Sequence, residues 1–481
     1  MYRLPHATAE RLNFQWDGRP VEARIGDTVA AALYAAGHRT IAHSRKFHRP
    51  RGLSGAFVAG HLARVDGVPN VRLDRAPVRA GLDVRPQNVW PRLDIDFLAL
   101  ARLIPRRLLR AGFEHTRLIP SGTPLFEPWE ALLRFMAGMA APPGAATGAV
   151  PGRRLDADTV VIGGGPAGIA AARAADGSVV LITRGAGPGT FAARCGAGPL
   201  QRPPSCTVLA GQEAFALYRQ GRLVAAAPVD GGPAVVIQAR RVVLATGRRS
   251  CPPLIPGADL PGVLDLHAAL TLVCDHAVAP GRRVAVIGAG DETKAAQRLG
   301  ELGVTLGVVL DAHQVTRIVG RSGVAGIEAE GRRHTCDAVI HAGPWRPDPS
   351  LAFQAGADGT QRLEARPLPA RVTLASDWSA EPIAFGPCLD DAALVCPCMD
   401  VTVAEVRALV CRGESHVEVV KRLTGCGMGT CQGVPCWDLL AATLGAITGQ
   451  PVDDRPSLRP PRGTLTLAQA AGLADVVEVE P

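Results

Sequence analysis

The residues best suited to chemistry are cysteines near the C-terminus, arranged as two close pairs. Cys396 and Cys398 form the first pair, and Cys431 and Cys436 form the second. Four cysteines in two close pairs are the minimum needed to hold an iron–sulfur cluster through thiolates. Cys426 is a spare that would replace Cys431 if the loop folds differently. Tetrahedral zinc and a vacant, vestigial site stay open as alternatives, because paired cysteines also suit zinc.

The segment between the two pairs is predicted to fold back on itself. Two capping boxes open helices over residues 403–411 and 416–423, and a glycine ends each helix. These signals are Thr402 with Glu405, Ser415 with Glu418, Gly413 and Gly425. A third helix over 437–444 is expected to begin just after Pro435. Four glycines around Cys426 and Cys431 indicate a loop that offers backbone N–H groups to cluster sulfides, which zinc does not require.

A glycine-rich turn predicts a first nucleotide fold. A buried strand over residues 159–162 enters Gly163, Gly165 and Gly168 and continues as an Ala-rich helix. In this pattern the first glycine makes the turn, the second lets the backbone approach a pyrophosphate, and the third lets helix and strand pack closely. The helix N-terminus then faces the phosphates. The sequence of this turn resembles that of FAD-binding flavoproteins of the disulfide-reductase type.

That resemblance implies further FAD-contacting positions. Ala245, Thr246 and Gly247 match the stretch by which the chain of such proteins returns past the nucleotide, and Asp377 stands where their acid reaches the ribityl–phosphate region. One departure is that the second strand ends in Thr183-Arg184, where an acid would bind the ribose. A phosphorylated ribose, weak nucleotide binding and an empty fold therefore stay open beside FAD.

A second, weaker turn predicts an NAD-type fold. Gly288 and Gly290 follow a Val/Ile strand, but Thr293 replaces the third glycine. The next strand ends in Asp311, an acid at the distance expected for ribose recognition, which favours NAD over NADP. A Rossmann fold used only as scaffold is the alternative.

The N-terminal residues begin with hairpin and helix signals. Two strands flank the tight turn Asp17-Gly18, and Asp27 is expected to cap a helix over 29–36. Together with His48-Arg49-Pro50-Arg51-Gly52, which follows, this pattern resembles the β-grasp ferredoxin-like module of larger oxidoreductase subunits. No cysteine precedes Cys195, so this module holds no thiolate cluster and is interpreted as structural or as a docking surface. His43, His48 and His61 have no common metal-site spacing and are interpreted as solvated or core side chains.

The predicted fold class is multidomain α/β, with a β-grasp module, two nested Rossmann-like folds and a small helical 2Fe-2S domain. The expected boundaries are a cluster-less β-grasp module (1–95), a helical segment and linker with helices over 95–109 and 128–139 (96–150), the first part of the FAD-type domain (151–265), the NAD-type domain (266–340), the return segment of the FAD-type domain (341–387), the 2Fe-2S domain (388–450) and an extended C-terminal arm (451–481).

Composition excludes some classes of function and cellular location. The formal charge of +8 is spread through Arg-rich segments, so nucleic-acid binding is not expected. No apolar run reaches the ~18 residues of a membrane span, and the first residues do not read as a signal peptide. Twelve cysteines without such a signal favour a reducing, cytoplasmic location. The seven isolated cysteines are interpreted as structural.

The chain as a whole resembles the A (alpha) subunits of heteromeric amine and amino-acid oxidoreductases, a group that includes sarcosine oxidase, opine oxidases, hydroxyproline dehydrogenase and hydrogen cyanide synthase. Its C-terminal part resembles the 2Fe-2S domain related to bacterioferritin-associated ferredoxin.

The resemblance implies an electron-transfer subunit paired with a B (beta) subunit that carries an amino-acid-oxidase-like FAD site, with room for a small third subunit. No catalytic residue is predicted in this chain, because no general-base constellation is found. A self-sufficient NAD(P)H-dependent flavin and iron–sulfur reductase is the alternative, and a non-enzymatic scaffold or assembly protein is a third.

Overall fold

The protein is described by a computed structural model. The structure describes residues 2–55, 62–103, 119, 122–136, 138, 148–198, 200–201, 203, 205–229, 231–288, 290–356, 368–375, 379–429, 432–452, 463, 465–474 and 476. Four predicted features lie wholly or mostly outside these residues: His61, Asp377, Cys431 and the arm over 451–462. The chain divides into two compact units. The first contains Met1–Pro143, Ser250–Pro344 and Glu381–Val452, and the second contains Gly144–Arg249, Trp345–Ala380 and Asp453–Pro481.

The first unit begins with the predicted β-grasp module. A five-stranded sheet has the order β2-β1-β7-β5-β6 and packs against helix α1. Its elements are β1 (Arg11–Trp16), β2 (Arg19–Arg24), α1 (Val29–Ala36), β5 (Leu62–Val65), β6 (Val68–Arg72) and β7 (Asp83–Pro86). Apolar residues alternate along β1 and β2, so Phe14, Trp16 and Val21 face the core while their neighbours face solvent.

The hairpin and the helix were predicted correctly, but the capping residue was not. Asp17 and Gly18 both adopt positive φ, as a tight hairpin turn requires. Helix α1 is capped by Thr28, whose side chain accepts from the Ala31 N–H. Asp27 is instead buried and accepts hydrogen bonds from Arg3. The prediction took the first capping-type residue as the cap, whereas the adjacent residue has that role.

Short elements lie within the module and after it. Their bounds are β3 (Ala42–His43), β4 (Pro50–Arg51), β8 (Pro91–Arg92), β9 (Ile95–Asp96), the 3-10 helix η1 (Phe97–Leu103) and α2 (Phe126–Met136). Of the helix predicted over 95–109, the described residues form strand β9 and then the 3-10 helix η1. The helix predicted over 128–139 begins two residues earlier than expected.

The first unit also contains the predicted second Rossmann-like fold. Its parallel sheet has the order β17-β23-β18-β19, and a three-stranded antiparallel sheet extends it. The elements are β17 (Val263–Asp265), α5 (Leu266–His276), β18 (Val284–Gly288), α6 (Glu292–Glu301), β19 (Leu306–Asp311), the 3-10 helix η3 (Ala312–Gln314), β20 (Val315–Gly320), β21 (Val324–Ala329), β22 (Arg332–His334) and β23 (Ala338–His341).

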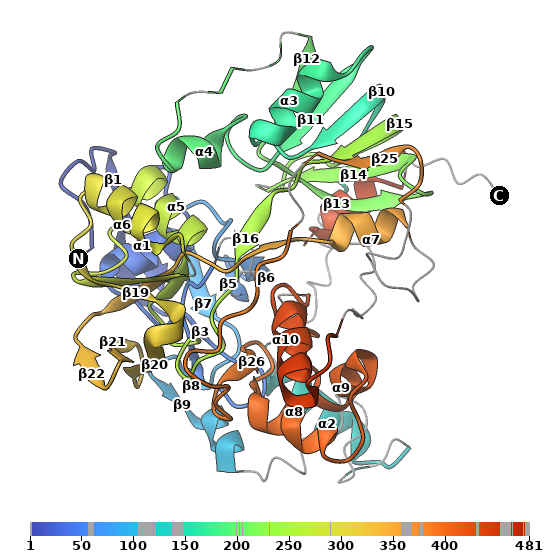
Figure 1. The fold of residues 1–481 in the computed structure, drawn as a ribbon. Coiled ribbons are helices and arrows are strands. Elements are labelled where there is room, and N and C mark those ends of the chain that lie inside the picture. Colours follow the sequence, from blue (N-terminus) through green and yellow to red (C-terminus); the bar gives the residue numbers. More distant parts are fainter. Residues whose placement is uncertain are drawn as a thin grey trace. The chain divides into compact units, whose positions relative to one another are not determined.

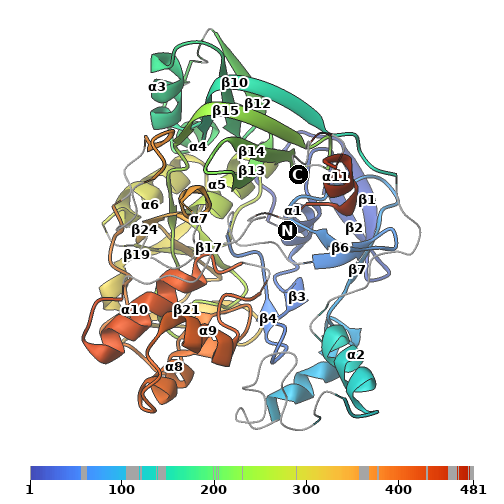
Figure 2. The same ribbon diagram turned by 90° about the vertical axis from the view of Figure 1, so that its right-hand side faces the viewer.

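A small helical domain completes the first unit. Figures 1 and 2 both show its helices α8, α9 and α10 gathered together in orange and red. The elements are β26 (Leu394–Cys396), β27 (Val401–Thr402), α8 (Val403–Val410), α9 (Val417–Thr424) and α10 (Cys436–Thr448). Their buried side chains form one apolar core that includes Cys396, Cys426 and Cys436.

The second unit is built on the first Rossmann-like fold. Its sheet has the order β12-β11-β10-β15-β14-β13, with β25 paired to β15. The elements are β10 (Arg153–Ile162), α3 (Pro166–Ala174), β11 (Val179–Thr183), α4 (Thr190–Arg194), β12 (Cys206–Ala210), β13 (Gln212–Tyr218), β14 (Leu223–Pro228), β15 (Val235–Leu244), α7 (Ser350–Ala355), β25 (Val372–Leu374) and α11 (Leu467–Gly472). Strands β16 (Arg248–Ser250) and β24 (Trp345–Pro347) pair where the chain leaves and re-enters this unit.

Alternation along the strands sets which helix covers which face of this sheet. Val161 and Leu181 share a core cluster with Ala172 of α3. Val160, the neighbour of Val161, belongs to a different cluster that contains Leu351 of α7. Because successive residues of a strand point to opposite faces, α3 and α7 cover the two sides of the sheet (Figure 1).

Among the helices that the structure describes, none combines the length and the apolar character that crossing a bilayer would need.

Candidate cofactor sites

The cysteine domain folds as its capping signals predicted. Thr402 and Glu405 form a reciprocal capping box on α8, with hydrogen bonds of 3.3 and 3.1 Å. Helix α9 ends at Gly425, which has a left-handed conformation. Its N-cap is His416 rather than Ser415, because the His416 ring nitrogen accepts from the Glu418 N–H at 3.2 Å. Helix α10 begins directly after Pro435 and is longer than predicted.

This arrangement brings three of the cysteines close together. Cys396 lies at the end of β26, Cys398 follows two residues later, and Cys426 lies just after α9. The Gly427 N–H donates to Cys396 Sγ at 3.4 Å. A hydrogen bond with Cys396, together with burial, raises the pKa of the Cys426 thiol well above its usual value. Cys436 is buried in the same core.

The glycines of this loop leave room for sulfur and for an aromatic ring. A Cβ atom on Gly429 would lie 2.4 Å from Cys398 Cβ and 3.3 Å from its Sγ. Cβ atoms on Gly427 and Gly433 would lie 2.0 and 2.1 Å from the indole of Trp437. The loop therefore needs glycine at these positions. Buried thiols beside the Gly427 N–H donor fit a thiolate-bound cluster. Cys426, predicted only as a replacement for Cys431, lies within hydrogen-bonding distance of Cys396.

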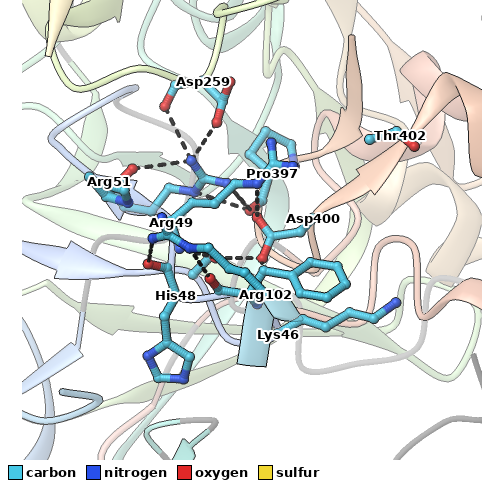
Figure 3. A network of polar contacts seen from close by, with 12 residues as sticks. Lys46, His48, Arg49, Arg51, Arg102, Asp259, Pro397, Asp400 and Thr402 are labelled. Carbon is cyan, nitrogen blue, oxygen red and sulfur yellow. Dashed lines mark hydrogen bonds and ion pairs between the residues drawn. The ribbon is translucent and has the colours of Figure 1, made fainter. Parts of the chain in front are cut away.

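The Cys-Pro-Cys loop is held by the basic segment of the β-grasp module (Figure 3). Arg51 Nε and Nη2 donate to the Pro397 carbonyl at 3.1 and 3.0 Å, and Nη2 donates to Asp400 at 2.7 Å. Arg51 Nη1 donates to Asp259 at 2.5 Å. Burial would lower the pKa of Arg51, but the charges of Asp259 and Asp400 outweigh it and raise that pKa. We call Ser44, Phe47, Arg51, Asp259 and Asp400 the clamp.

Asp400 is the centre of the clamp. It is fully buried, has φ of 53°, and accepts from the Phe47 N–H at 2.9 Å and the Ser44 hydroxyl at 2.5 Å. Arg45 N–H donates to the Cys398 carbonyl at 3.4 Å. These contacts indicate how the β-grasp module, interpreted above as structural, could support the cysteine domain. Its basic run fixes the loop that carries Cys396 and Cys398.

The first nucleotide fold fits a dinucleotide at its glycine turn. Gly163 has φ of 119°, and a Cβ atom there would lie 2.0 Å from the Ala245 carbonyl oxygen. A Cβ atom on Gly168 would lie 1.8 Å from the Gly163 carbonyl oxygen. Gly165, by contrast, faces open space, as a pyrophosphate-binding position requires. The Thr246 hydroxyl beside this turn is buried without a hydrogen-bond partner among the described residues, so a polar ligand group would satisfy it.

The departure at the end of β11 also has a structural explanation. Thr183 is buried against the turn, since a Cβ atom on Gly164 would lie 2.6 Å from its hydroxyl. Arg184 pairs with Glu213 at 3.5 Å. Gly247 has a positive φ and open space in front of it. The predicted FAD contact at Asp377 lies outside the described residues.

The second nucleotide fold fits a dinucleotide poorly. Glu292, the first residue of α6, folds back so that its carboxylate accepts from the Gly290 N–H at 2.8 Å. A Cβ atom on Gly288 would lie 2.9 Å from the same carboxylate oxygen. Asp311 caps η3 by accepting from the His313 N–H at 2.8 Å. A pyrophosphate would have to displace the carboxylate of Glu292, so the predicted NAD contacts at Gly288, Gly290 and Asp311 gain no support from the geometry.

Sequence reasoning missed three functional features. Asp400 and Arg51 are separated by 349 residues, and no local pattern pairs them. Glu292 carried a signal, because an acid directly after a glycine turn can fill the anion position. Asp96 lies beside two histidines that were interpreted as solvated or core side chains.

Two family matches agree with the fold. Residues 9–89 match the family described as "2Fe-2S iron-sulfur cluster binding domain", and residues 157–292 match "Pyridine nucleotide-disulphide oxidoreductase". The predicted α/β class, the N-terminal ferredoxin-like module and the Rossmann-like fold are thereby confirmed. The 2Fe-2S family matches the N-terminal module and not the C-terminal domain in which we predicted the cluster. Residues 9–89 nevertheless contain no cysteine.

Curated relatives are components of oxidoreductases. The alpha subunit of sarcosine oxidase from Rhizobium meliloti (strain 1021) is 30% identical over an alignment of 547 positions. The alignment covers 90% of this chain and 55% of that protein. The A subunit of opine oxidase from the same organism is 30% identical over 148 residues, 30% of this chain and 31% of that protein. The chain thus spans about half the length of the sarcosine oxidase relative.

A solved structure shares the fold over nearly the whole length. The crystal structure of L-proline dehydrogenase from P. horikoshii aligns over 98% of this chain and 99% of that chain, with a TM-score of 0.71 and 21% identity. This likeness shows the fold.

Proposed function

We propose that this chain is the electron-transfer subunit of a heteromeric FAD-dependent dehydrogenase or oxidase that acts on secondary amines, opines, or imino or amino acids. In this proposal its C-terminal domain carries a 2Fe-2S cluster. The observation that supports it best is the buried cysteine loop held by the clamp. The names of the similar proteins, which are components of a sarcosine oxidase and an opine oxidase and an L-proline dehydrogenase, point to CH–NH donors.

The substrate would be oxidised on a partner. In the part of this chain that the structure describes, Ser250 Oγ and His341 Nδ1 lie 2.7 Å apart and resemble a nucleophile with its base, but both are buried. Burial lowers the pKa of His341 to about 3, so the pair serves packing rather than proton transfer at neutral pH. We therefore place the amine site on a flavin-carrying subunit of amino-acid-oxidase type.

The chain's own residues would prepare the relay. Cys396, Cys398 and Cys436 are the proposed ligands together with Cys431, and Cys426 is the alternative to Cys431. The Gly427 N–H would donate to sulfur, which stabilises negative charge there. The clamp fixes the Pro397 carbonyl and so the spacing of the first cysteine pair. When bound, a 2Fe-2S cluster supplies a one-electron carrier and FAD a carrier that connects it to two-electron chemistry.

The alternative of a self-sufficient NADH-dependent reductase is less well supported. It requires a dinucleotide at the second nucleotide fold, where the carboxylate of Glu292 fills the anion position. Adenine nucleotide binding at the first fold stays part of the proposal, with Gly163, Gly165, Gly168 and Ala245–Gly247 as its contacts.

The test is iron content and a low-temperature EPR spectrum of the anaerobically purified chain after dithionite reduction. We expect about two irons per chain and a rhombic signal. Cys398→Ser should remove both, whereas Cys411→Ser is the matched control because Cys411 is an exposed cysteine of the same domain. Comparing Cys426→Ser with Cys431→Ser identifies the fourth ligand.

Two outcomes would contradict the proposal. Absence of iron and signal from the wild-type chain would leave a zinc site or a vestigial loop. Rapid NADH oxidation by the isolated chain with an artificial acceptor would favour the self-sufficient reductase.

A further inference from the structure

Two histidines and one aspartate converge next to the clamp. His43 Nδ1 lies 2.7 Å from Asp96 Oδ2, and His48 Nδ1 lies 2.8 Å from the same oxygen. One ligand atom from each residue lies within 4.8 Å of the others, and among the described residues this is the group of metal-ligating side chains with that geometry. The two imidazole rings are nearly perpendicular, at 78°.

The group is buried and built to hold a charge. The side chains of His43, His48 and Asp96 are 8%, 0% and 2% exposed. Asp96 Oδ1 accepts from the Trp90 and Leu98 N–H groups at 3.1 Å each, which fixes the carboxylate from behind. Its other oxygen, Oδ2, faces the two imidazole nitrogens.

Nε2 of His48 is not engaged by the residues that the structure describes. It is buried and has no hydrogen-bond partner among them, and Figure 3 shows the ring pointing away from the clamp. At Nδ1 the hydrogen bond to Asp96 favours the tautomer that carries its proton there. A cation that takes the Nδ1 lone pair replaces that hydrogen bond, and the proton then passes to the unengaged Nε2.

We propose that His43, His48 and Asp96 form a binding site for one divalent transition-metal ion, of the zinc class. Binding moves the proton of each neutral imidazole from Nδ1 to Nε2, and the ion takes the two Nδ1 lone pairs and Asp96 Oδ2. Two imidazoles and one carboxylate are a common ligand set for such ions, with one position left for water. Burial of all three side chains makes the site structural rather than catalytic.

The position of the site gives it a role. His43 and His48 flank Ser44 and Phe47, two of the three clamp residues that donate to Asp400. Asp96 is the last residue of strand β9, which follows the sheet of the module. An ion held by all three would join the loop to that strand and so stiffen the segment that fixes the Cys-Pro-Cys loop. The site itself does not depend on the presence of a cluster.

The test is the zinc content of the full chain after removal of metals with a chelator, reloading with zinc and dialysis. We expect about one more zinc per chain in wild type than in His43→Gln. His276→Gln is the matched control, because His276 also faces a carboxylate in the first unit, Asp27 at 3.3 Å, without a second histidine. It should take up as much zinc as wild type.

Spectroscopy on the wild-type chain separates this site from the cysteines and needs no variant. Cobalt substituted here should give ligand-field bands without the intense thiolate-to-cobalt absorption that cysteine sites produce, and zinc X-ray absorption should show a component with only nitrogen and oxygen ligands. Equal zinc in wild type and His43→Gln, or a metal component with sulfur ligands alone, would overturn the proposal. Either result can occur whether or not the chain holds iron.

Discussion

Replacing Arg51 by methionine removes the charge that joins Pro397, Asp400 and Asp259 while keeping much of the side-chain volume. Asp400 is fully buried and would keep its hydrogen bonds from Ser44 and Phe47 and a 3.9 Å ion pair with Arg49. Losing one partner of a buried ion pair costs about 3–5 kcal/mol. The side chain of Asp259 is 12% exposed and can regain some water, so we expect the lower end of that range, about 3 kcal/mol.

Hydrogen exchange read by mass spectrometry measures this loss where it occurs. Peptides covering β26 and β27 report opening of the Cys-Pro-Cys loop, and about 3 kcal/mol corresponds to roughly 150-fold faster exchange. Arg49→Met is the matched control. It also removes a guanidinium that faces Asp400, but Arg49 is one-third exposed and its Nε lies 3.9 Å from the carboxylate. Such a pair contributes about 0–1 kcal/mol.

The comparison of the two variants decides whether the reasoning holds. If both variants change exchange in these peptides by the same factor, then Arg51 does not hold the loop. The same conclusion, that Arg51 does not hold the loop, would follow if exchange changed only in peptides far from residues 394–402. Iron content measured in parallel should fall in Arg51→Met and stay at the wild-type value in Arg49→Met.

Three further outcomes are expected. Gly165→Ala should leave the melting temperature unchanged yet weaken adenine-nucleotide binding, measured by calorimetry, whereas Gly168→Ala should lower the melting temperature, because its Cβ would lie 1.8 Å from a carbonyl oxygen. Equal melting temperatures would refute this. Glu292→Gln should strengthen binding of NADH, measured by fluorescence titration, since it removes the negative charge from the anion position; unchanged binding would show that the carboxylate is no obstacle. Burial lowers the pKa of His341 to about 3, so below its ordinary value of 6.5 the unfolded chain binds a proton that the folded chain does not. His341 should therefore contribute a fall of about 1.4 kcal/mol per pH unit in the free energy of unfolding from pH ~6 to ~3, and His341→Gln, compared by denaturant unfolding at several pH values, should reduce the slope by that amount.

Local signals in the sequence were reliable where one short segment decides the structure. The box of Thr402 and Glu405, the left-handed Gly425 and the Asp17-Gly18 turn all formed as predicted, because each depends on residues within four positions. Errors of one residue occurred at Asp27 and Ser415, where the adjacent residue also had a side chain able to cap the helix.

Features that join distant segments could not be predicted in the same way. Arg51 was recognised as part of a basic run, but its partners Asp259 and Asp400 come from two other parts of the chain. Asp96 lies 53 residues from His43, so the spacing of the histidines alone pointed to no metal site. The function of a buried charge depends on its partner, and sequence patterns indicate partners only at short range.

The separation of Arg51 from Asp400 has a consequence for biosynthesis. Arg51 leaves the ribosome 349 residues before Asp400, the fully buried one of its two acidic partners. At typical synthesis rates of about 5–20 residues per second this interval is roughly 20–70 s. Until Asp400 has been made, Arg51 has Asp259 alone of these two partners, so the packing around the guanidinium stays incomplete. Closure of the loop between Cys396 and Cys398 therefore belongs to the last stage of folding. Chains should therefore retain metal at the cysteines only after Asp400 has been made and the clamp has formed. In this way the clamp would restrict stable metal binding to nearly complete chains.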